Sequence, residues 1–459
     1  MAPTGSDRGR PARSGIRVPW AYSDRPVPRH VVRPLQEFLN ASTSGGVLLV
    51  AAAVIAIIWA NSPYSGAYER MWRSTLSVGI GTHGVTEDLR SWVNDGLMAL
   101  FFLVVGLEIK RELLTGELRD RRAAALPAIA AIGGMVVPAA IYLATNVGGG
   151  GIRGWGIAMP TDIAFTLGVL ALAARRAPPS LKSFVLTLAI VDDILTIVVI
   201  AIFYPSGVSI APLLAAVAVG GAIVALERIH VRASVVYVAL GVAMWIAMHD
   251  SGVPPALSGV AIGLLTPAVP FQRPRDVSEE AVRVADETVD EPDPPDADAH
   301  WWFYLARLSK EAVSPLARVE HFLLPWTTFV VLPLFALANA GVTLSGHALA
   351  TALTSRITVG VAVGRVVGKI AGIGVATWLA VRSGLCRLPE GMRFAHVLGV
   401  GAAAGVAFTV SLFVAGLAFA GHPELAQQAK VGVLVSALIA GPLGYLLLRR
   451  ASASGDDSH

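Results

Sequence analysis

Two adjacent carboxylates, Asp192 and Asp193, lie midway along an apolar stretch from Ser180 to Tyr204. Ionisable groups inside membrane-spanning helices are costly and usually lie on a substrate or ion pathway. Because neighbouring helix positions point about 100° apart, one carboxylate can face a cavity while the other meets a partner on another helix. Burial and mutual repulsion favour the protonated form of a carboxylate, whereas a cation favours the charged form. The pair is therefore suited to exchanging protons for a metal cation, and satisfaction by hydrogen bonds alone is the plainer alternative.

A third carboxylate follows a proline in the segment Met159-Pro160-Thr161-Asp162. Pro160 lacks a backbone donor and clashes with the preceding turn, so it predicts a break in this helix. A break at membrane depth is tolerated where it lines a cavity or is buried in protein, and it leaves half-helix ends with partial charges. Asp162 would offset the positive charge of N-terminal ends, and Thr161 could offer an oxygen to a hard cation. A simple proline kink capped by Asp162 is the alternative.

A lysine supplies the counter-charge to these carboxylates. Lys369 lies in Gly364-Arg365-Val-Val-Gly368-Lys369, inside another apolar segment, and the nearby glycines allow a close approach of other helices. We expect Lys369 to form an ion pair with one of the membrane carboxylates, since a buried lysine without a partner would be neutral. Arg365, one turn earlier, is expected to extend its charge toward a membrane interface.

Charged residues also cluster near the ends of two apolar segments. One segment ends with Leu107-Glu108-Ile-Lys110-Arg111-Glu112, and another begins with Val319-Glu320-His321. A histidine among carboxylates titrates near neutral pH, so the cluster could sense protons at the entrance to an ion path. Interfacial anchoring by weak ion pairs explains the same residues equally well. Asp95, between about three and four helical turns before Glu108, fits either interpretation.

The composition is that of a polytopic membrane protein. The chain has 459 residues, of which 54% are hydrophobic and 15% charged, whereas in soluble proteins about a quarter are charged. With a single cysteine, Cys386, the chain can form no internal disulfide, no Cys-x-x-Cys redox pair and no cysteine metal cluster. It also has no nucleophile elbow and no phosphate-binding loop. We therefore expect no enzyme, no cofactor and no binding of nucleic acid.

Twelve apolar segments approach the roughly 20 residues that cross a bilayer, although the seventh and eighth are short. The sequence therefore predicts an all-α polytopic membrane protein with about twelve transmembrane helices. The segments are Ser44–Asn61, Trp92–Leu114, Ala123–Asn146, Trp155–Ala174, Ser180–Tyr204, Ile210–Leu226, Val235–Met248, Pro254–Pro267, His321–Val342, Ile357–Val381, His396–Phe419 and Ala426–Leu448.

Two of these segments share a pattern. Gly399, Gly401 and Gly405 precede Ala407-Phe408-Thr409 in the eleventh segment, and Ala164-Phe165-Thr166 follows the predicted break in the fourth. The fourth segment is the middle one of segments three to five, and the eleventh is the middle one of segments ten to twelve. This placement is typical of inverted-topology repeats of three helices.

The distribution of Lys and Arg indicates the orientation, because cytoplasmic loops carry an excess of both. With the N-terminus inside, most basic residues fall in cytoplasmic segments, and both termini are cytoplasmic. The outer loops then hold only Arg70, Arg73, Arg90, Arg153 and Arg356.

The chain divides into three parts by composition. Residues 1–43 form an Arg- and Pro-rich cytoplasmic tail, 44–450 the membrane domain and 451–459 a disordered C-terminal tail. Within the membrane domain, the cytoplasmic loop 268–310 is acidic and Pro-rich, a composition typical of a disordered, solvated linker.

The outer loop 62–91 has a different pattern. Alternating apolar residues flank Gly81-Thr82-His83-Gly84 and predict a β-hairpin near Leu76–Val85. A lone hairpin is marginally stable, so its exposed edge could pair with that of a second protomer. The sequence thus favours a homodimer.

Five strings of residues, in this order, carry a resemblance to a known family: Trp92-Val-Asn-Asp95-Gly-Leu-Met-Ala-Leu-Phe-Phe-Leu-Val-Val-Gly-Leu-Glu108, Pro160-Thr161-Asp162-Ile-Ala-Phe165, Leu188-Ala-Ile-Val-Asp192-Asp193, Leu332-Pro-Leu-Phe-Ala-Leu-Ala-Asn339-Ala-Gly341 and Gly368-Lys369. They closely resemble the NhaA-type sodium/proton antiporters of bacteria, over about residues 35 to 450. This family is itself a standard example of inverted repeats, so the repeat pattern agrees with the resemblance.

The resemblance implies a particular arrangement of helices. The fourth and eleventh would be unwound, near Pro160 and Gly405, and would cross close to the midplane of the bilayer. Asp162 and Lys369 would balance the dipole ends of these unwound helices.

The resemblance also implies roles for the site residues. Asp193 would be the main cation ligand and proton carrier, and Asp192 the partner of Lys369. Na⁺ would bind at these two carboxylates, with Thr161 in the same site. Asp95 would support function.

The pH-responsive entrance of the family would correspond to Glu108, Glu320 and His321. Three positions depart from the family pattern. Pro254 stands where the best-known members have a histidine linked to pH response, and Ala317 and Leu324 stand where a lysine and a second histidine are usual. The resemblance therefore implies exchange chemistry without implying the usual steep pH switch.

The activity implied is electrogenic: protons move inward and Na⁺ or Li⁺ is expelled across the bacterial plasma membrane, in support of pH homeostasis. Two alternatives remain on the same fold, a sodium-coupled symporter of organic anions and a pH sensor that does not transport. A bulky organic anion would need a roomier site, and paired carboxylates beside a membrane lysine favour protons and small cations instead.

Overall fold

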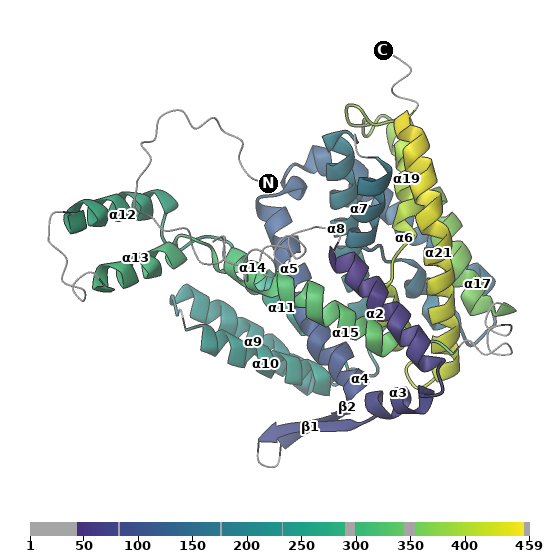
Figure 1. Cartoon of the computed structure of the whole chain (residues 1–459), viewed down its shortest axis with the longest axis horizontal. Helices are drawn as coiled ribbons and strands as arrows, with labels where there is room; N and C mark the ends of the chain where they lie inside the picture. Colours follow the sequence, from purple (N-terminus) through teal and green to yellow (C-terminus); the bar gives the residue numbers. More distant parts are fainter. Residues whose placement is uncertain are drawn as a thin grey trace, which may run out of the picture. The chain divides into compact units, whose positions relative to one another are not determined.

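The computed structural model describes residues 44–80, 83–174, 177–231, 233–289, 299–343, 350 and 354–453. The described residues from Gly46 onward belong to one compact unit, which is mostly helical with one two-stranded sheet (Figure 1). The tail predicted at 1–43 lies outside the described residues. Disorder was the wrong prediction for residues 451–453, because helix α21 continues from Pro423 to Ala453.

Eight helical segments of the described chain are long and apolar enough to cross a membrane. They are Leu89–Leu114, α6 (Arg121–Thr145), α8 (Pro179–Phe203), α9 (Ile210–Arg228), α10 (Ser234–Ser251), Pro315–Asn339, Arg356–Arg382 and α21.

Three of these segments contain a π-helical turn, a rare element that is frequent at functional sites. The turn η3 (Trp92–Leu97) lies between α4 (Leu89–Ser91) and α5 (Met98–Leu114). The turn η6 (Thr327–Val331) lies between α14 (Pro315–Trp326) and α15 (Leu332–Asn339). The turn η7 (Gly364–Gly368) lies between α17 (Arg356–Val363) and α18 (Lys369–Arg382).

Three further pairs of helices are apolar enough to span the membrane together but are bent at a short break. The pair α2 (Ser44–Ala60) and α3 (Ser65–Trp72) bends by 116°. The pair η5 (Ile152–Ala158) and α7 (Ile163–Ala173) bends by 41°. The pair α19 (Phe394–Ala404) and α20 (Thr409–Ala418) bends by 51°.

The number of spans is therefore eight, or eleven if each bent pair is one span. The predicted segment Pro254–Pro267 corresponds to α11 (Leu257–Leu265), whose 9 residues are too few to cross a bilayer alone. The structure supports a polytopic all-α membrane protein, and the predicted total of about twelve helices is not confirmed.

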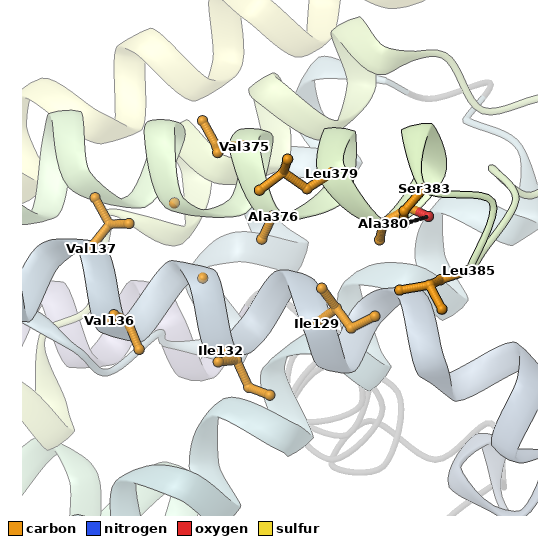
Figure 2. Close-up of a pocket in the computed structure, with 12 residues that line it drawn as sticks. Ile129, Ile132, Val136, Val137, Val375, Ala376, Leu379, Ala380, Ser383 and Leu385 are labelled. Atoms are coloured by element: carbon orange, nitrogen blue, oxygen red, sulfur yellow. Dashed lines mark hydrogen bonds between the residues drawn. The ribbon is translucent and has the colours of Figure 1, made fainter.

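Helices α6 and α18 pack with their backbones in close contact. A Cβ atom on Gly372 of α18 would lie 2.1 Å from the carbonyl oxygen of Gly133 of α6. Small residues at such contacts let membrane helices approach closely. Beside this contact the two helices line an apolar groove of about 500 Å³ (Figure 2). Its one polar side chain, Ser383, donates a hydrogen bond to the Ala380 carbonyl at 3.2 Å, so this groove offers no ligand set for a cation.

We expect Gly372→Ala to destabilise the protein, because the added methyl group overlaps the backbone of α6. Overpacking of this kind costs typically about 1–3 kcal/mol. Thermal melting of the detergent-solubilised protein measures the effect. The matched control is Gly221→Ala on α9, where nothing lies within 4 Å of the new Cβ atom. Equal melting temperatures for the two variants would contradict the close contact.

A β-hairpin occupies the predicted outer loop, residues 62–91. Strands β1 (Thr75–Ile80) and β2 (His83–Asp88) pair antiparallel, with Val78 opposite Val85 (Figure 1). The hydroxyls of Ser77 and Thr86 are hydrogen-bonded across the strands at 2.8 Å. Leu76 and Val78 are exposed, which keeps the homodimer prediction open.

Two helices occupy most of the acidic loop, α12 (Pro274–Val289) and α13 (Ala299–Glu311). Disorder was therefore the wrong prediction for these residues. Val277 and Val284, two helical turns apart on α12, are both buried, and the Tyr304 hydroxyl of α13 donates to the Glu280 carboxylate at 3.4 Å. A hydrogen bond from Arg283 to Glu280 also lowers the pKa of that carboxyl. The average composition of the loop concealed this small helix-helix contact.

Candidate ion-binding site

The two adjacent carboxylates of α8 have different environments. Asp192 is fully buried and pairs with Lys369, whose Nζ lies 3.3 Å from Oδ1 and 3.4 Å from Oδ2. Lys369 is the first residue of α18 and is also buried. The ion pair expected for Lys369 is thus present, between two helices that the sequence separates by 177 residues.

The same ammonium group reaches the break between η5 and α7. Lys369 Nζ donates a hydrogen bond to the Thr161 hydroxyl at 2.7 Å. Thr161 directly follows Pro160, and both lie in the break where the sequence predicted an interruption. Lys369 therefore joins α8 to the broken segment through two oxygen acceptors.

Asp162 joins the two broken segments to each other. It is the N-cap residue of α7, and its Oδ2 accepts a hydrogen bond from the hydroxyl of Thr409 at 3.0 Å. Thr409 is the first residue of α20. A carboxylate at the N-terminal ends of two helices offsets their partial positive charges, as the sequence suggested. Thr409 itself was missed as a site residue, although the repeated Ala-Phe-Thr pattern pointed to it.

Asp193 is only partly buried, in contrast to Asp192. Among the described residues its carboxylate accepts no hydrogen bond and forms no ion pair. The charged groups that act on it are Asp192, Glu108, Asp162 and Lys369. Three of these four are carboxylates, so the surroundings of Asp193 attract a cation.

One turn farther along α8, the hydroxyl of Thr196 is buried and has no hydrogen-bond partner in the described chain. Residues at i and i+4 lie on the same face of a helix, so Thr196 shares the face of Asp192. Buried hydroxyls in native proteins nearly always have a partner, which can be a water molecule or an ion. Sequence reasoning had assigned no role to Thr196.

Arg365 lies in a different place from the one predicted. Its side chain is fully buried and does not extend to a membrane interface. The guanidinium donates to the Gly405 carbonyl from Nε at 3.3 Å and from Nη2 at 3.1 Å, and to the Ser411 hydroxyl from Nη1 at 2.6 Å. These acceptors lie on the two sides of the break between α19 and α20, so the guanidinium is hydrogen-bonded inside the protein.

Gly405 is the C-cap residue of α19 and has no space for a side chain. A Cβ atom there would lie 2.8 Å from the backbone oxygen of Arg365 and 2.9 Å from the Cβ atom of Ala440. The break between α19 and α20 is therefore in backbone contact with the π-turn η7.

The candidate entrance residues meet around an arginine that sequence reasoning gave no central role. Arg111 forms a hydrogen-bonded ion pair with Glu320 of α14, and its Nη2 lies 3.8 Å from Glu108 and 3.7 Å from Glu112. His321 is exposed, and no hydrogen bond or ion pair ties it to the described part of this cluster. The structure thus brings Glu108 and Glu320 together and leaves His321 outside.

Asp95 lies in the π-turn η3 and is not part of the Asp192 site. Its backbone oxygen accepts a hydrogen bond from the indole of Trp245 at 2.8 Å, and Trp245 stacks on Trp92 with ring centroids 5.8 Å apart. No hydrogen bond or ion pair within the described residues links its carboxylate to Asp192 or Asp193. The contacts fix the backbone of η3 against α10.

The three residues at departures from the family pattern have ordinary structural environments. Pro254 is buried in the turn between α10 and α11, after Gly252 with a φ of 78°. Ala317 lies in the first turn of α14, where its backbone N–H donates to Ser314 at 3.2 Å. Leu324 is exposed on the same helix. None of the three can titrate.

Comparisons with known proteins agree with the geometry. The model of a family described as Na⁺/H⁺ antiporter 1 matches residues 36–448. The chain is 43% identical to the Na⁺/H⁺ antiporter NhaA 2 of Sorangium cellulosum over 94% of this chain and 93% of that protein. It is 46% identical to the Na⁺/H⁺ antiporter NhaA 3 of Frankia alni, over 91% and 89% of the two chains.

A more distant relative shows the same coverage. The Na⁺/H⁺ antiporter NhaA of Sulfurimonas denitrificans is 39% identical over 93% of this chain and 97% of its own length. The family is one of transporters, consistent with the several apolar helices of a multi-pass membrane protein. On the match across residues 36–448, this chain belongs to the Na⁺/H⁺ antiporter 1 family.

Proposed function

We propose that the protein is an electrogenic antiporter that exports Na⁺ or Li⁺ in exchange for inward-moving protons, at one carboxylate site reached alternately from the two sides of the membrane. The observation that carries this proposal is the difference between the two carboxylates of α8. Lys369 neutralises the buried Asp192, whereas Asp193 has no partner among the described residues. A charge without a partner, beside further carboxylates, is suited to bind either a proton or a small cation.

Exchange follows from competition for this site. At high pH, Na⁺ displaces the proton from Asp193, and at low pH the proton displaces Na⁺. Both loaded forms permit the site to change sides, because their charge is compensated. The empty, charged form does not, because moving uncompensated charge through lipid is costly.

Net charge movement requires more than one proton for each Na⁺. Asp193 supplies one protonatable group, and the Asp192–Lys369 pair supplies a second. When Na⁺ is bound, its charge competes with that of the Lys369 ammonium for the same carboxylates. The two breaks, at Pro160 and at Gly405, would correspond to unwound helices that cross near the midplane, with Asp162 at their N-terminal ends.

The remaining assignments follow the same proposal. The protein would lie in the bacterial plasma membrane with both termini cytoplasmic, and it would contribute to pH homeostasis. Arg111, with Glu108 and Glu320, would form the cytoplasmic entrance. A homodimer would form through the hairpin edge near Leu76–Val85.

Everted membrane vesicles that respire test this function. NaCl, LiCl and KCl are added in turn across a range of pH, and the proton gradient is followed with a fluorescent dye. We expect Na⁺ and Li⁺ to release the gradient and K⁺ to have no effect. With no titratable group at Pro254, Ala317 or Leu324, the activity should rise gradually with pH. If none of the salts acts while folded protein is present, the symporter or the pH sensor replaces the antiporter.

We also propose that the unpartnered hydroxyl of Thr196 contributes an oxygen to the bound cation or to its water. Thr196→Val keeps the shape and removes the hydroxyl, so the apparent KM for Na⁺ should rise about threefold to tenfold, the effect of one lost hydrogen bond. The maximal rate should stay close to that of the wild type. The matched control is Thr377→Val, because the hydroxyl of Thr377 is equally buried and unpartnered in the described chain but lies two turns beyond Lys369. Equal shifts in both variants would disprove the role of Thr196.

A further inference from the structure

A second buried cation lies on the same helical segment as Lys369, and the proposed exchange mechanism makes no use of it. Arg365 is 0% exposed and lies one turn before Lys369. Unlike Lys369, Arg365 has no carboxylate within ion-pair distance in the described part of the chain. A buried guanidinium without hydrogen-bond acceptors is strongly unfavourable in free energy. The acceptors that Arg365 contacts therefore indicate its role.

Its contacts are with the two sides of one helix break. Gly405 caps the C-terminal end of α19, and its carbonyl accepts two of the guanidinium hydrogen bonds. Ser411 lies in the first turn of α20 and accepts the third. The C-terminal end of a helix carries a partial negative charge, so a cation there is stabilising. The planar guanidinium of an arginine serves both acceptors from three separate nitrogens held in a rigid fork, whereas a lysine would have to reach both from a single nitrogen.

The same break leads directly to the proposed ion site. Thr409, two residues before Ser411, donates its hydrogen bond to Asp162. Thr161, next to Asp162, accepts from Lys369. A continuous series of hydrogen bonds and helix turns therefore joins Arg365 to Asp162 through the start of α20.

We infer that Arg365 is the positioning residue of the second broken helix: its guanidinium balances the carbonyl end of α19 and fixes the start of α20, so that Lys369 remains available for Asp192 and Thr161. In this arrangement Arg365 balances the helix end and Lys369 pairs with Asp192. It differs from the arrangement in which Lys369 itself balances the helix ends. The effect on transport rests on the proposed function, whereas the effect on the break does not.

The test uses two variants and their combination. Arg365→Lys keeps the charge and loses the fork, and Ser411→Ala keeps the fork and loses one acceptor. We expect the apparent KM for Na⁺ in vesicles to rise about tenfold for Arg365→Lys and about threefold for Ser411→Ala. The double variant should be no worse than Arg365→Lys alone, because residues that act through one contact are not additive. Thr377→Val, which removes a hydroxyl without a partner in the described chain, should keep the wild-type KM.

Hydrogen–deuterium exchange of the purified protein gives a readout that is independent of transport. Peptides covering residues 402–411 should exchange faster in Arg365→Lys and in Ser411→Ala, and peptides of α9 and α10 should not change. A lower melting temperature with unchanged KM and unchanged exchange at 402–411 would overturn the inference, and so would fully additive effects on KM. If the wild type itself does not transport Na⁺, the proposed function fails. The rates of hydrogen–deuterium exchange at 402–411 still decide the role of Arg365.

Discussion

Asp193→Asn abolishes Na⁺-dependent proton release while the protein still inserts and folds: this is the largest effect that we expect. Asparagine has nearly the same shape as aspartate but cannot carry a proton or a negative charge. Because Asp193 has no hydrogen bond or ion pair within the described residues, its replacement removes no structural contact. Activity should therefore fall below detection. The free energy of unfolding should stay within about 0.5 kcal/mol of the wild-type value, as for substitutions away from structural contacts, so the melting temperature should hardly change.

The measurement is the vesicle assay at matched protein amounts, with the melting temperature of the purified protein beside it. The control is Asp250→Asn at the end of α10, an exposed aspartate whose Oδ1 lies 3.4 Å from Nδ1 of His249. This variant should exchange like the wild type. Wild-type Na⁺ efflux from Asp193→Asn would refute the assignment of Asp193 as the proton carrier.

The second large effect is a loss of stability in Lys369→Ala. Lys369 and Asp192 are 1% and 0% exposed, so solvent does not screen their interaction. Removing one partner of a buried ion pair leaves the other charge uncompensated, at a cost of about 3–5 kcal/mol. Asp192 can reduce this cost by binding a proton, so the difference in melting temperature between variant and wild type should narrow as the pH falls. For the same reason the pH dependence of exchange should change.

Thermal melting across pH 5 to pH 9, a range of about four units around neutrality, measures this effect. Lys182→Ala is the control, because Lys182 is exposed in the first turns of the same helix that carries Asp192. The double variant Lys369→Ala, Asp192→Asn should recover part of the lost stability, because no uncompensated charge remains. An unchanged melting temperature together with an unchanged pH profile would exclude the pair as a stabilising contact.

The parts of the site that the sequence predicted correctly follow from local geometry. The angle between neighbouring helix positions is enough to separate the environments of Asp192 and Asp193, whatever the rest of the fold. Likewise, Pro160 cannot continue a helix, and the break at 159–162 follows from the chemistry of proline alone. The alternation of apolar residues in the outer loop was enough for the hairpin.

The parts that the sequence did not predict depend on contacts between distant residues. The hydrogen bond from Thr409 to Asp162 joins positions 247 residues apart, and that from Arg365 to Ser411 joins positions 46 apart. A long cationic side chain can serve an interface or a buried helix end, and only the neighbouring helices decide between them. For α12 and α13, the average composition indicated disorder, whereas the structure has two helices in contact, with Val277 and Val284 buried two helical turns apart on α12.

The π-turns affect both the prediction of the buried faces of these spans and the effect of deletions in them. Each one inserts an additional residue into a helix that is otherwise regular, and so shifts the phase of all the residues that follow by about 100°. The segments on either side of η7 share one neighbour and differ in the other: both pack on α6, whereas α17 also packs on α21 and α18 on α19. If a single helical period of apolar residues is fitted across the whole span, the buried face of one of its halves is assigned wrongly. By the same geometry, deleting a single residue between Gly364 and Gly368 would restore a continuous α-helix and rotate α18, with Lys369, by about 100° relative to α17. A change in the length of this span should therefore disrupt the packing of one of its halves.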